Sequence, residues 1–464
     1  MKIEKDRVHF LGIGGTGMSG LAKVLLEQGC PVSGSDLADS KTTRRLVRLG
    51  AQVFQGHEAA NLADDVATVV VSTAVRADNP ELVAARERGL EILHRADLLA
   101  RLMAMKKGIA VAGAHGKTTT SAMISVILEQ SGWDPAIVVG GELQEIDGNG
   151  KWGQGDYLVA EADESDGSFV KLHPWMAVIT NIEDDHLDHY QTVAAIEAAF
   201  EQFTDNVARD GWLVLCDDDP RLREMACRRS SSPIITYGLN PTAEYHCRDL
   251  TVTSTGTAFE VYHRERCLGR IMLPVPGLHN VSNALAAIAC ADRIGLDFAL
   301  IAGALASFRG AGRRFQWIGE EQGVRVVDDY AHHPTEVKAT LAAARQLSPQ
   351  RLICVFQPHR YTRTQAQYIP FGAAFDDADL VVLNEIYAAG EAPIPGVAAA
   401  LIADGIGNRS GKAVPVIADK GEIVAYLAGI AQPGDLIMTM GAGHIWTVGP
   451  DLLACLKERG GKEE

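Results

Sequence analysis

A glycine-rich stretch with a lysine and several threonines, Val111–Thr120 (VAGAHGKTTT), has the residue types and spacing of a phosphate-binding loop. The apolar run Ile109–Val111 leads into it, and helix-forming residues follow from Thr120 to about Gln130. Glycines let backbone N–H groups approach a polyphosphate, a lysine reaches its terminal oxygens, and a hydroxyl can ligate Mg²⁺. The loop residues are Gly113, Ala114, His115, Gly116, Lys117, Thr118 and Thr119. Because Val111 replaces the first glycine of the usual spacing, a strand–helix turn without a ligand stays open as the alternative.

A second glycine-rich stretch lies near the start of the chain, where Gly12–Gly17 has the pattern G-x-G-x-x-G. The strand-like run Val8–Ile13 leads into it, and Asp36 follows another strand-like run, Pro31–Ser35. In dinucleotide-binding folds such glycines admit a diphosphate, and the acidic residue binds a ribose hydroxyl. By itself the pattern predicts NAD, but it requires only a diphosphate attached to a ribose. A Rossmann-like fold without a ligand is the structural alternative.

Acidic residues follow two further apolar runs. Tyr157–Ala160 is followed by Glu161 and the sequence ADESD, and Met176–Thr180 by NIEDDHLDHY, which contains His186. Carboxylates at strand ends that face a phosphate loop suit Mg²⁺. One acidic run is as readily a solvated charged face. Two of them at the carboxyl edge of one parallel sheet, where open α/β folds bind ligands, favour a site.

The last third of the chain repeats this arrangement with basic and aromatic residues. Four apolar runs are each followed by a polar cluster: Val324–Val327, Arg351–Phe356, Leu380–Leu383 and Leu436–Met440. The clusters read DDYAHHPTE, QPHRYTRT, NEIYAAGE and GAGH, and the paired arginines of GRRF precede the first of them. This pattern predicts a second doubly wound sheet whose carboxyl edge binds an anionic ligand.

The alternation of strands and helices predicts an α/β protein of three domains. We expect an N-terminal Rossmann-like domain over 1–105, a central P-loop-like ATPase domain with a mostly parallel sheet over 106–311, and a C-terminal Rossmann-like domain over 312–464. Arg101–Lys107 should form a polar, basic link into the central domain. Short alternating runs between Ile234 and Pro274 predict a β-rich excursion, after which PVPGLHNVSN opens a helix over Ala284–Ile294.

Composition excludes several protein classes. The chain has 464 residues, 47% of them hydrophobic, and no apolar run approaches the roughly 20 residues of a membrane helix, so we expect no membrane insertion. A formal net charge of −16 disfavours nucleic acid as a partner. The eight cysteines are scattered without a Cys-x-x-Cys pair, which fits a cytoplasmic protein with neither a zinc site nor a disulfide framework. We expect a monomer or a homodimer.

Eight sequence blocks, in order along the chain, resemble the Mur ligase family. They are AGAHGKTTT, EADESDGSF, TNIEDDHLDHY, PGLHNVSNALAA, GRRF, DDYAHHPTE, FQPHRYTRT and IYAAGEAPI, and GIGGTGMSGLA precedes them. Together the matches run from Gly12 to Gly443. Ala114 and Ala331 depart from the family pattern, where Thr and Gly are common, but neither change removes a charged or metal-binding group. Since the family's N-terminal domain holds the UDP of a sugar substrate, the resemblance replaces the NAD interpretation with UDP.

The resemblance implies an ATP-dependent ligase of peptidoglycan precursor synthesis. It would join L-alanine to the lactyl carboxylate of UDP-N-acetylmuramate through an acyl phosphate, with ATP and Mg²⁺ as cofactors. The implied catalytic residues are Lys117, His186 and Arg314. The implied Mg²⁺ ligands are Thr118, Glu161 and His186.

The resemblance also assigns residues to each substrate. For ATP they are the loop Gly113–Thr119 together with Asn280, Asn283 and Arg314. For the UDP-sugar they are Gly14, Gly15, Thr16, Gly17, Asp36, Ser72, Thr73 and His279. For the amino acid they are Tyr330, His332, Arg360 and Arg363.

Three other functions stay open at this point. A ligase of the same family that attaches a whole tripeptide to the same sugar fits the blocks, since acceptor size is not readable from spacing. An NAD-dependent oxidoreductase explains Gly12–Gly17 and Asp36 but leaves Lys117, Glu161 and His186 without a role. A non-catalytic nucleotide-binding scaffold leaves the intact lysine and acidic runs unexplained.

Overall fold

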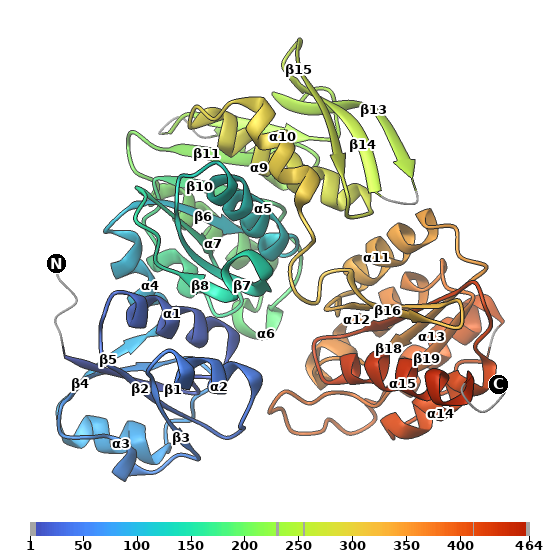
Figure 1. Ribbon diagram of the computed structural model, residues 1–464, viewed down its shortest axis with the longest axis horizontal. Coiled ribbons are helices and arrows are strands. Elements are labelled where there is room, and N and C mark those ends of the chain that lie inside the picture. Colours follow the sequence, from blue (N-terminus) through green and yellow to red (C-terminus); the bar gives the residue numbers. More distant parts are fainter. Residues whose placement is uncertain (1–5, 229–231, 254–255, 412, 461–464) are drawn as a thin grey trace. The chain divides into compact units, whose positions relative to one another are not determined.

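The computed structural model describes residues 6–228, 232–253, 256–411 and 413–460 (Figure 1). They form two compact units. The first runs to Arg248 and adds Glu260–Ile271 and Ser282–Phe308, and the second comprises Asp249–Phe259, Met272–Val281 and the chain from Arg309 onward. Within these described ranges, no helix is both long and apolar enough to span a bilayer.

The first unit begins with a five-stranded parallel sheet in the order β3-β2-β1-β4-β5. Its strands are β1 (Arg7–Leu11), β2 (Val32–Asp36), β3 (Gln52–Gln55), β4 (Val66–Val71) and β5 (Glu91–His94). Its helices are α1 (Thr16–Glu27), α2 (Lys41–Arg48), α3 (Pro80–Glu87) and α4 (Arg95–Met103), with a short 3-10 helix η1 (Ala59–Asn61). Helix α1 packs against α2 and α4, and α3 packs against η1 and β5 (Figure 1).

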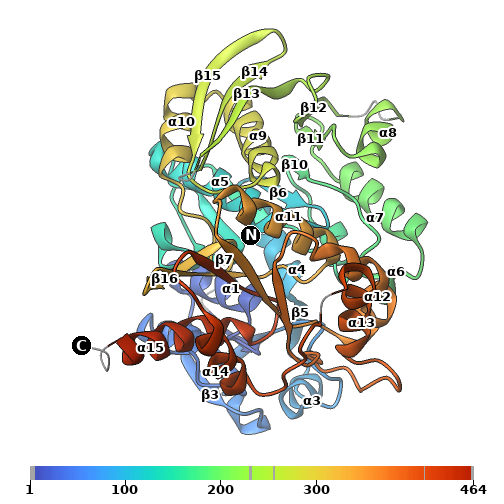
Figure 2. The ribbon, with the colours of Figure 1, turned by 90° about the vertical axis from the view of Figure 1, so that its right-hand side faces the viewer.

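A ten-stranded sheet follows, in the order β15-β14-β13-β12-β11-β10-β6-β9-β7-β8. Its strands are β6 (Lys107–Ala112), β7 (Ala136–Leu143), β8 (Gly148–Lys151), β9 (Tyr157–Glu161), β10 (Met176–Ile179), β11 (Trp212–Cys216), β12 (Ile234–Gly238), β13 (Tyr245–Thr253), β14 (Gly256–His263) and β15 (Arg266–Leu273). Parallel pairing joins β12, β11, β10, β6, β9 and β7, in this order across the sheet. Every residue of β10 is buried, as expected for a sheet covered on both faces. The β-rich excursion is confirmed, with β14 and β15 as long neighbouring strands (Figure 2).

Two helices of this region begin earlier than the sequence analysis expected. They are α5 (Lys117–Gln130), α6 (Leu187–Tyr190), α7 (Val193–Asp205), α8 (Pro220–Arg228), α9 (Leu278–Arg293) and α10 (Phe298–Ser307), with 3-10 helices η2 (Gln144–Ile146) and η3 (Ser168–Lys171). The predicted starts at Thr120 and Ala284 were wrong. Helix α5 starts at Lys117, directly after Gly116 in a left-handed conformation, and helix α9 starts at Leu278. The predicted link Arg101–Lys107 was also too long: α4 includes Arg101, and β6 begins at Lys107.

A hairpin of β7 and β8 contacts helix α1 within the first unit. The two strands pair antiparallel at one end of the central sheet. A Cβ at Gly150 would lie 2.2 Å from the carbonyl oxygen of Gly20, so the two backbones approach more closely than any larger residue permits. The Asn149 side chain donates a hydrogen bond to the carbonyl oxygen of Thr16. The hairpin therefore packs directly on the helix that follows the N-terminal glycine loop.

The second unit contains a sheet in the order β16-β17-β20-β18-β19, in which only β16 is antiparallel to its neighbour among the described pairs. Its strands are β16 (Gln316–Glu321), β17 (Val324–Asp329), β18 (Arg351–Phe356), β19 (Leu380–Leu383) and β20 (Asp435–Met440). Its helices are α11 (Pro334–Gln346), α12 (Tyr361–Ala374), α13 (Ala400–Ser410), α14 (Lys420–Ile430) and α15 (Val448–Gly460), with a short η4 (Ile445–Thr447). Alternate residues of β18 pack into two hydrophobic cores, one on each face of the sheet. Leu352 and Phe356 pack with α11, α12 and α13, whereas Ile353 and Val355 pack with α14 and α15.

The predicted fold class is confirmed, because three mostly parallel α/β sheets follow one another along the chain. The four apolar runs of the last third are β17, β18, β19 and β20, and their polar clusters lie at one edge of the sheet, as expected. The domain boundaries after residues 105 and 311 stay predictions.

Candidate active site

The glycine-rich loop between β6 and α5 requires two of its glycines. Gly113 has φ +132°, and a Cβ there would lie 2.1 Å from Thr180 Oγ1. Gly116 has φ +83°, and a Cβ there would lie 2.5 Å from Asn283 Oδ1. Both conformations and both contacts exclude a side chain. The backbone N–H of His115 donates to Asn181 Oδ1 (2.9 Å), which ties the loop to the segment after β10.

Lys117, the first residue of α5, is held inside this loop. Its Nζ donates to the carbonyl oxygens of Gly113 (2.6 Å) and Ala114 (3.1 Å) and to Glu164 Oε1 (2.9 Å). Burial lowers the pKa of the ammonium, but neighbouring carboxylates, led by Glu164, raise it by more, so the net shift is upward. The lysine therefore stays charged, which contact with a polyphosphate requires.

Glu161, the last residue of β9, lies beside the first turn of α5, which also contains the buried Thr119. Its Oε2 accepts hydrogen bonds from Thr118 Oγ1 (2.9 Å) and from the backbone N–H of Gly140 on β7 (2.8 Å). A carboxylate and a hydroxyl in contact beside a phosphate loop offer the oxygen ligands that Mg²⁺ prefers. The donor set of Thr118 and Glu161 thus fits the predicted cation.

We expect the substitution Gly140→Ala to displace the Glu161 carboxylate. A Cβ at position 140 would lie 2.3 Å from Glu161 Oε2. Since a displacement of about 1 Å in a catalytic group can cost up to about 10²-fold in rate, turnover should fall by about tenfold or more. Turnover is measured against Mg²⁺ concentration, and the half-saturating concentration should rise. Gly303→Ala on α10, where a Cβ meets nothing within 4 Å, is the control; an unchanged Mg²⁺ dependence in Gly140→Ala would contradict the assignment.

Glu164 is a site residue that the sequence reasoning left undistinguished within its acidic run. Its side chain is 4% exposed, and its carboxylate lies 2.9 Å from Lys117 Nζ and 3.4 Å from His186 Nε2. Burial lowers the pKa of His186, whereas Glu164 and Asp185 raise it by more. A raised pKa favours the protonated ring, which does not ligate a cation. The predicted role of His186 as a Mg²⁺ ligand therefore requires that its proton leave.

The acidic run also joins the N-terminal sheet to the central sheet within the first unit. Arg95, at the start of α4, lies 2.7 Å from Asp163 Oδ2 and 3.3 Å from Asp166 Oδ2. Burial raises the pKa of Asp163, but Arg95 and Lys117 lower it by more, so that the net value is about 2. Thr73 Oγ1 donates to Asp166 Oδ2 (3.4 Å). Thr73, a predicted UDP-sugar residue, thus contacts the acidic run that also holds Lys117.

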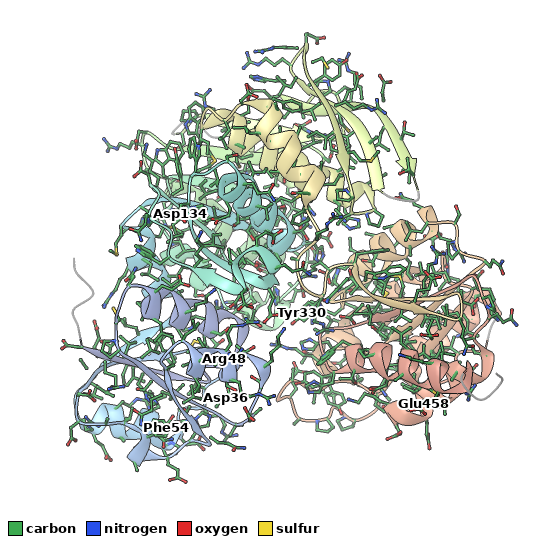
Figure 3. The ribbon with its side chains drawn as sticks, in the orientation of Figure 1. Asp36, Arg48, Phe54, Asp134, Tyr330 and Glu458 are labelled. Atoms are coloured by element: carbon green, nitrogen blue, oxygen red, sulfur yellow. The ribbon has the colours of Figure 1, made fainter. Side chains whose placement is uncertain are left out.

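The N-terminal glycine loop is organised by the end of β2. The backbone N–H groups of Gly12 and Ile13 donate to the carbonyl oxygen of Ser35 (2.9 and 3.0 Å), and that of Gly14 donates to Asp36 Oδ2 (2.9 Å). A Cβ at Gly14 would lie 2.9 Å from this same oxygen, so the contact requires glycine. Asp36, labelled in Figure 3, therefore orders the loop; its contact with a ribose stays a prediction.

The remaining residues predicted to bind the UDP-sugar surround this loop or belong to the second unit. Gly15 precedes α1, Thr16 begins it, and Gly17 lies in its first turn, where backbone N–H groups suit a diphosphate. Ser72 directly follows β4. His279 lies in the second unit, where burial lowers the pKa of its ring to about 4, so the ring is neutral at neutral pH.

The two asparagines predicted to contact ATP lie on the first turns of α9. Asn283 Oδ1 accepts from Thr120 Oγ1 (3.2 Å) within the first unit, next to Gly116. Asn280 Nδ2 donates to the carbonyl oxygen of Pro276 (2.6 Å) within the second unit. The structure therefore brings Asn283 against the phosphate loop, and Asn280 anchors the turn that starts α9.

In the second unit, polar residues gather at the carboxyl end of β17. Tyr330 follows this strand (Figure 3), and the guanidinium groups of Arg313 and Arg314 each lie 5.0 Å from the centre of its ring. The His332 ring centre is 5.4 Å from that of Tyr330. Glu336 lies 3.8 Å from Arg314 and accepts the backbone N–H of His332 (3.0 Å). The structure thus brings together three predicted residues: Arg314, Tyr330 and His332.

Arg360 and Arg363 join this cluster from the start of α12. The ring centres of His332 and His359 are 5.5 Å apart, and His359 Nδ1 lies 3.0 Å from a guanidinium nitrogen of Arg363. The backbone N–H of Arg360 donates to the carbonyl oxygen of Tyr387 (2.8 Å). His359 and Tyr387, which the sequence reasoning did not select, stack with ring centres 5.7 Å apart. Guanidinium groups beside such rings suit the carboxylate of an amino acid.

Asp329, the last residue of β17, is buried between the segments that carry these residues. Its carboxylate accepts the backbone N–H groups of Phe315 (2.7 Å) and Ala331 (2.7 Å). Burial raises the pKa of Asp329 from 3.8 to about 6, against the opposing effect of Arg314. A carboxyl group with a higher pKa in the folded than in the unfolded protein stabilises the fold at low pH, and this contribution is lost as pH rises from about 4 to 6.

The substitution Asp329→Asn should weaken this pH dependence. The amide cannot ionise, so the free energy of unfolding should fall less between pH 4.5 and 6.5 than in the wild type, with a difference of about 2 kcal/mol. Urea titrations at several pH values measure it, and Asp404→Asn, at an exposed position of α13, is the control. Identical pH profiles for wild type and Asp329→Asn would contradict the prediction.

Comparison with known proteins gives the family. Residues 7–107 match the family model described as "Mur ligase family, catalytic domain", residues 111–291 match "Mur ligase middle domain", and residues 313–443 match "Mur ligase, glutamate ligase domain". Curated relatives match over nearly the whole chain. The UDP-N-acetylmuramate–L-alanine ligase of Pelotomaculum thermopropionicum is 55% identical over 456 residues, 98% of each chain. The protein of the same name from Carboxydothermus hydrogenoformans is 50% identical over 446 residues, 96% of each.

Solved structures of Mur-type ligases also match this chain over nearly its full length. The UDP-N-acetylmuramate-alanine ligase of Thermotoga maritima is 30% identical, with a TM-score of 0.85, and the match covers 98% of this chain and 100% of that one. A murein peptide ligase of Psychrobacter arcticus is 26% identical, with a TM-score of 0.74 and coverage of 97% and 98%. With three family models in order and relatives of this identity over the full length, the chain belongs to the Mur ligase family.

Proposed function

We propose that this protein joins L-alanine to the lactyl carboxylate of UDP-N-acetylmuramate, with cleavage of ATP to ADP and phosphate, as a step of peptidoglycan precursor synthesis. The observation that carries the proposal is the combination of about 50% identity to ligases of this name over the full chain with a phosphate loop in which Lys117 donates to Glu164 and Thr118 donates to Glu161.

The chemistry explains why a nucleotide is needed. An amine does not displace oxide from a carboxylate, so the lactyl carboxylate first attacks the γ-phosphorus of ATP, which gives an acyl phosphate and ADP. The amine of L-alanine then attacks the acyl carbon, and the tetrahedral intermediate expels phosphate as the amide bond forms. In this scheme Lys117 and Arg314 stabilise the charge on the transferred phosphoryl group, since electrostatic positioning supplies most phosphoryl-transfer catalysis.

The other site residues bind and orient the substrates. Thr118 and Glu161 would hold a Mg²⁺ ion, which neutralises phosphate charge when bound, and His186 would contact a second one after losing its proton. Arg360 and Arg363 would bind the carboxylate of L-alanine, with Tyr330 and His332 lining the same pocket. Asn280 and Asn283 would contact ATP, and the Gly14–Gly17 turn with Asp36, Ser72, Thr73 and His279 would bind the UDP-sugar.

Phosphate release from ATP with UDP-N-acetylmuramate tests the proposal directly. L-Alanine, glycine, L-serine, D-glutamate and the Ala-Glu-diaminopimelate tripeptide are offered separately. We expect turnover with L-alanine to exceed that with every other acceptor. Turnover with the tripeptide alone would assign the protein to the tripeptide-attaching ligases, and no turnover with any acceptor would refute a ligase function.

A further inference from the structure

A buried polar cluster in the N-terminal sheet contains residues with no role in the scheme above. We call it the Glu81 cluster: His9 on β1, Ser33 and Ser35 on β2, His57 and Asn61 after β3, and Glu81 on α3. The side chains of His9 and Glu81 have no exposed surface at all. Buried charged groups are rare in proteins unless a network satisfies them, so the cluster calls for an explanation.

The Glu81 carboxylate is the centre of this network. Ser35 Oγ donates to its Oε2 (2.5 Å), and Asn61 Nδ2 donates to its Oε1 (2.6 Å). His57 Nδ1 lies 3.2 Å from Oε2, and His9 Nε2 lies 3.8 Å from Oε1. Burial raises the pKa of Glu81, but His9, Ser35 and Asn61 lower it by more, to about 2. Glu81 is therefore a buried anion, whose desolvation is offset by the groups that it holds in place.

Those groups adjoin the N-terminal glycine loop. Ser35 is the residue whose carbonyl oxygen accepts the N–H groups of Gly12 and Ile13, and it directly precedes Asp36, which binds the N–H of Gly14. Asn61 Nδ2 also donates to the carbonyl oxygen of Gly56 (3.2 Å), and the N–H of Gly56 donates to the carbonyl oxygen of Asp36 (2.8 Å). Glu81 thus fixes the backbone on both sides of Asp36.

We propose that Glu81 is a positioning residue for the UDP-sugar: through Ser35 and Asn61 it sets the place of Asp36 and of the glycine loop, without touching the ligand. This inference rests on the proposed function for the identity of its ligand. Residues that orient the ligands of a metal site typically contribute about 10- to 100-fold to its affinity, and we expect an effect of the same order here. Because the network belongs to the N-terminal sheet alone, its loss should weaken binding of the UDP-sugar and leave ATP and L-alanine unaffected.

The test is the substitution Glu81→Gln, which keeps the shape and removes the charge. We expect the KM for UDP-N-acetylmuramate to rise about tenfold, while kcat and the KM values for ATP and L-alanine stay within about twofold. Calorimetric titration with UDP alone should show the same loss without any turnover. Glu87→Gln, at an exposed position of the same helix, is the matched control and should match the wild type in both measurements.

The outcomes separate positioning from a merely structural role. If Glu81→Gln lowers the melting temperature and the active fraction but leaves the KM for the UDP-sugar and the affinity for UDP unchanged, the inference is overturned. Where Glu81→Gln does not fold, Asn61→Ala, which keeps the anion but cuts its link to Gly56, must show the same rise in KM for the inference to stand. A wild-type protein that binds UDP but forms no amide would refute the proposed function and leave the UDP titration to decide the inference.

Discussion

Replacing Lys117 with alanine should lower kcat for L-alanine ligation by about 10³-fold or more. Loss of one group that stabilises transition-state charge costs about 10²- to 10³-fold, and a cation on a transferred phosphoryl group can contribute more. Phosphate release under saturating substrates measures the effect. Lys171→Ala, which removes a lysine from a surface ion pair with Asp97 in the same unit, is the control and should retain wild-type turnover.

The same substitution should also destabilise the protein, because it leaves the buried Glu164 carboxylate without its ammonium partner. Breaking a buried ion pair from one side typically costs about 3 to 5 kcal/mol. The double variant Lys117→Ala/Glu164→Gln removes that charge and should recover most of the lost stability, but none of the turnover. If the double variant recovered turnover, the loss in Lys117→Ala would come from misfolding, and the catalytic role of Lys117 would be wrong.

The second large effect is expected at Glu161. In Glu161→Gln the side chain keeps its volume but loses the negative charge beside Thr118 Oγ1, so the affinity for Mg²⁺ and the turnover should each fall by about 10²-fold. Binding of Mn²⁺ as a paramagnetic probe, followed by water-proton relaxation in the absence of ATP, reads the metal site without catalysis.

Glu145→Gln, at an exposed position of η2, is the control for this experiment and should bind Mn²⁺ as the wild type does. Undiminished Mn²⁺ binding in Glu161→Gln, together with reduced turnover, would place the role of Glu161 in substrate orientation rather than in holding the cation.

The strands that carry the site could be predicted because they are short runs of buried apolar residues. β18 and β19 begin and end where the predicted runs do, since strands covered on both faces tolerate little else. Their polar clusters could be assigned to one edge because parallel strands end at the same edge. The phosphate loop could be recognised because positive φ and close contacts with neighbouring side chains restrict Gly113 and Gly116 to glycine.

Other features depended on tertiary contacts that local sequence does not encode. The hairpin of β7 and β8 is rich in glycine: β8 (GNGK) has no apolar residue, and two glycines interrupt β7 (AIVVGGEL) after its apolar half. Packing against α1, which local sequence does not encode, positions these glycine-rich parts. Glu164 shares its run with other acidic residues of equal local propensity, and its contacts with Lys117 and His186 identify it only after folding. The Glu81 cluster could not be predicted from the sequence, because its members come from four separate segments that meet only in the folded sheet.

The close packing of Gly20 on Gly150 should hold the N-terminal and central sheets together even when the chain between them is cut. The N-terminal and central sheets are joined covalently by three residues, 104–106, between α4 and β6, but they are held together a second time by the α1–hairpin contact and by the Asn149 bond to Thr16. A single proteolytic cut between α4 and β6 should therefore nick the chain without separating the fragments. The two fragments would comigrate under native conditions and separate only in denaturant, because the contact between α1 and the hairpin keeps them associated.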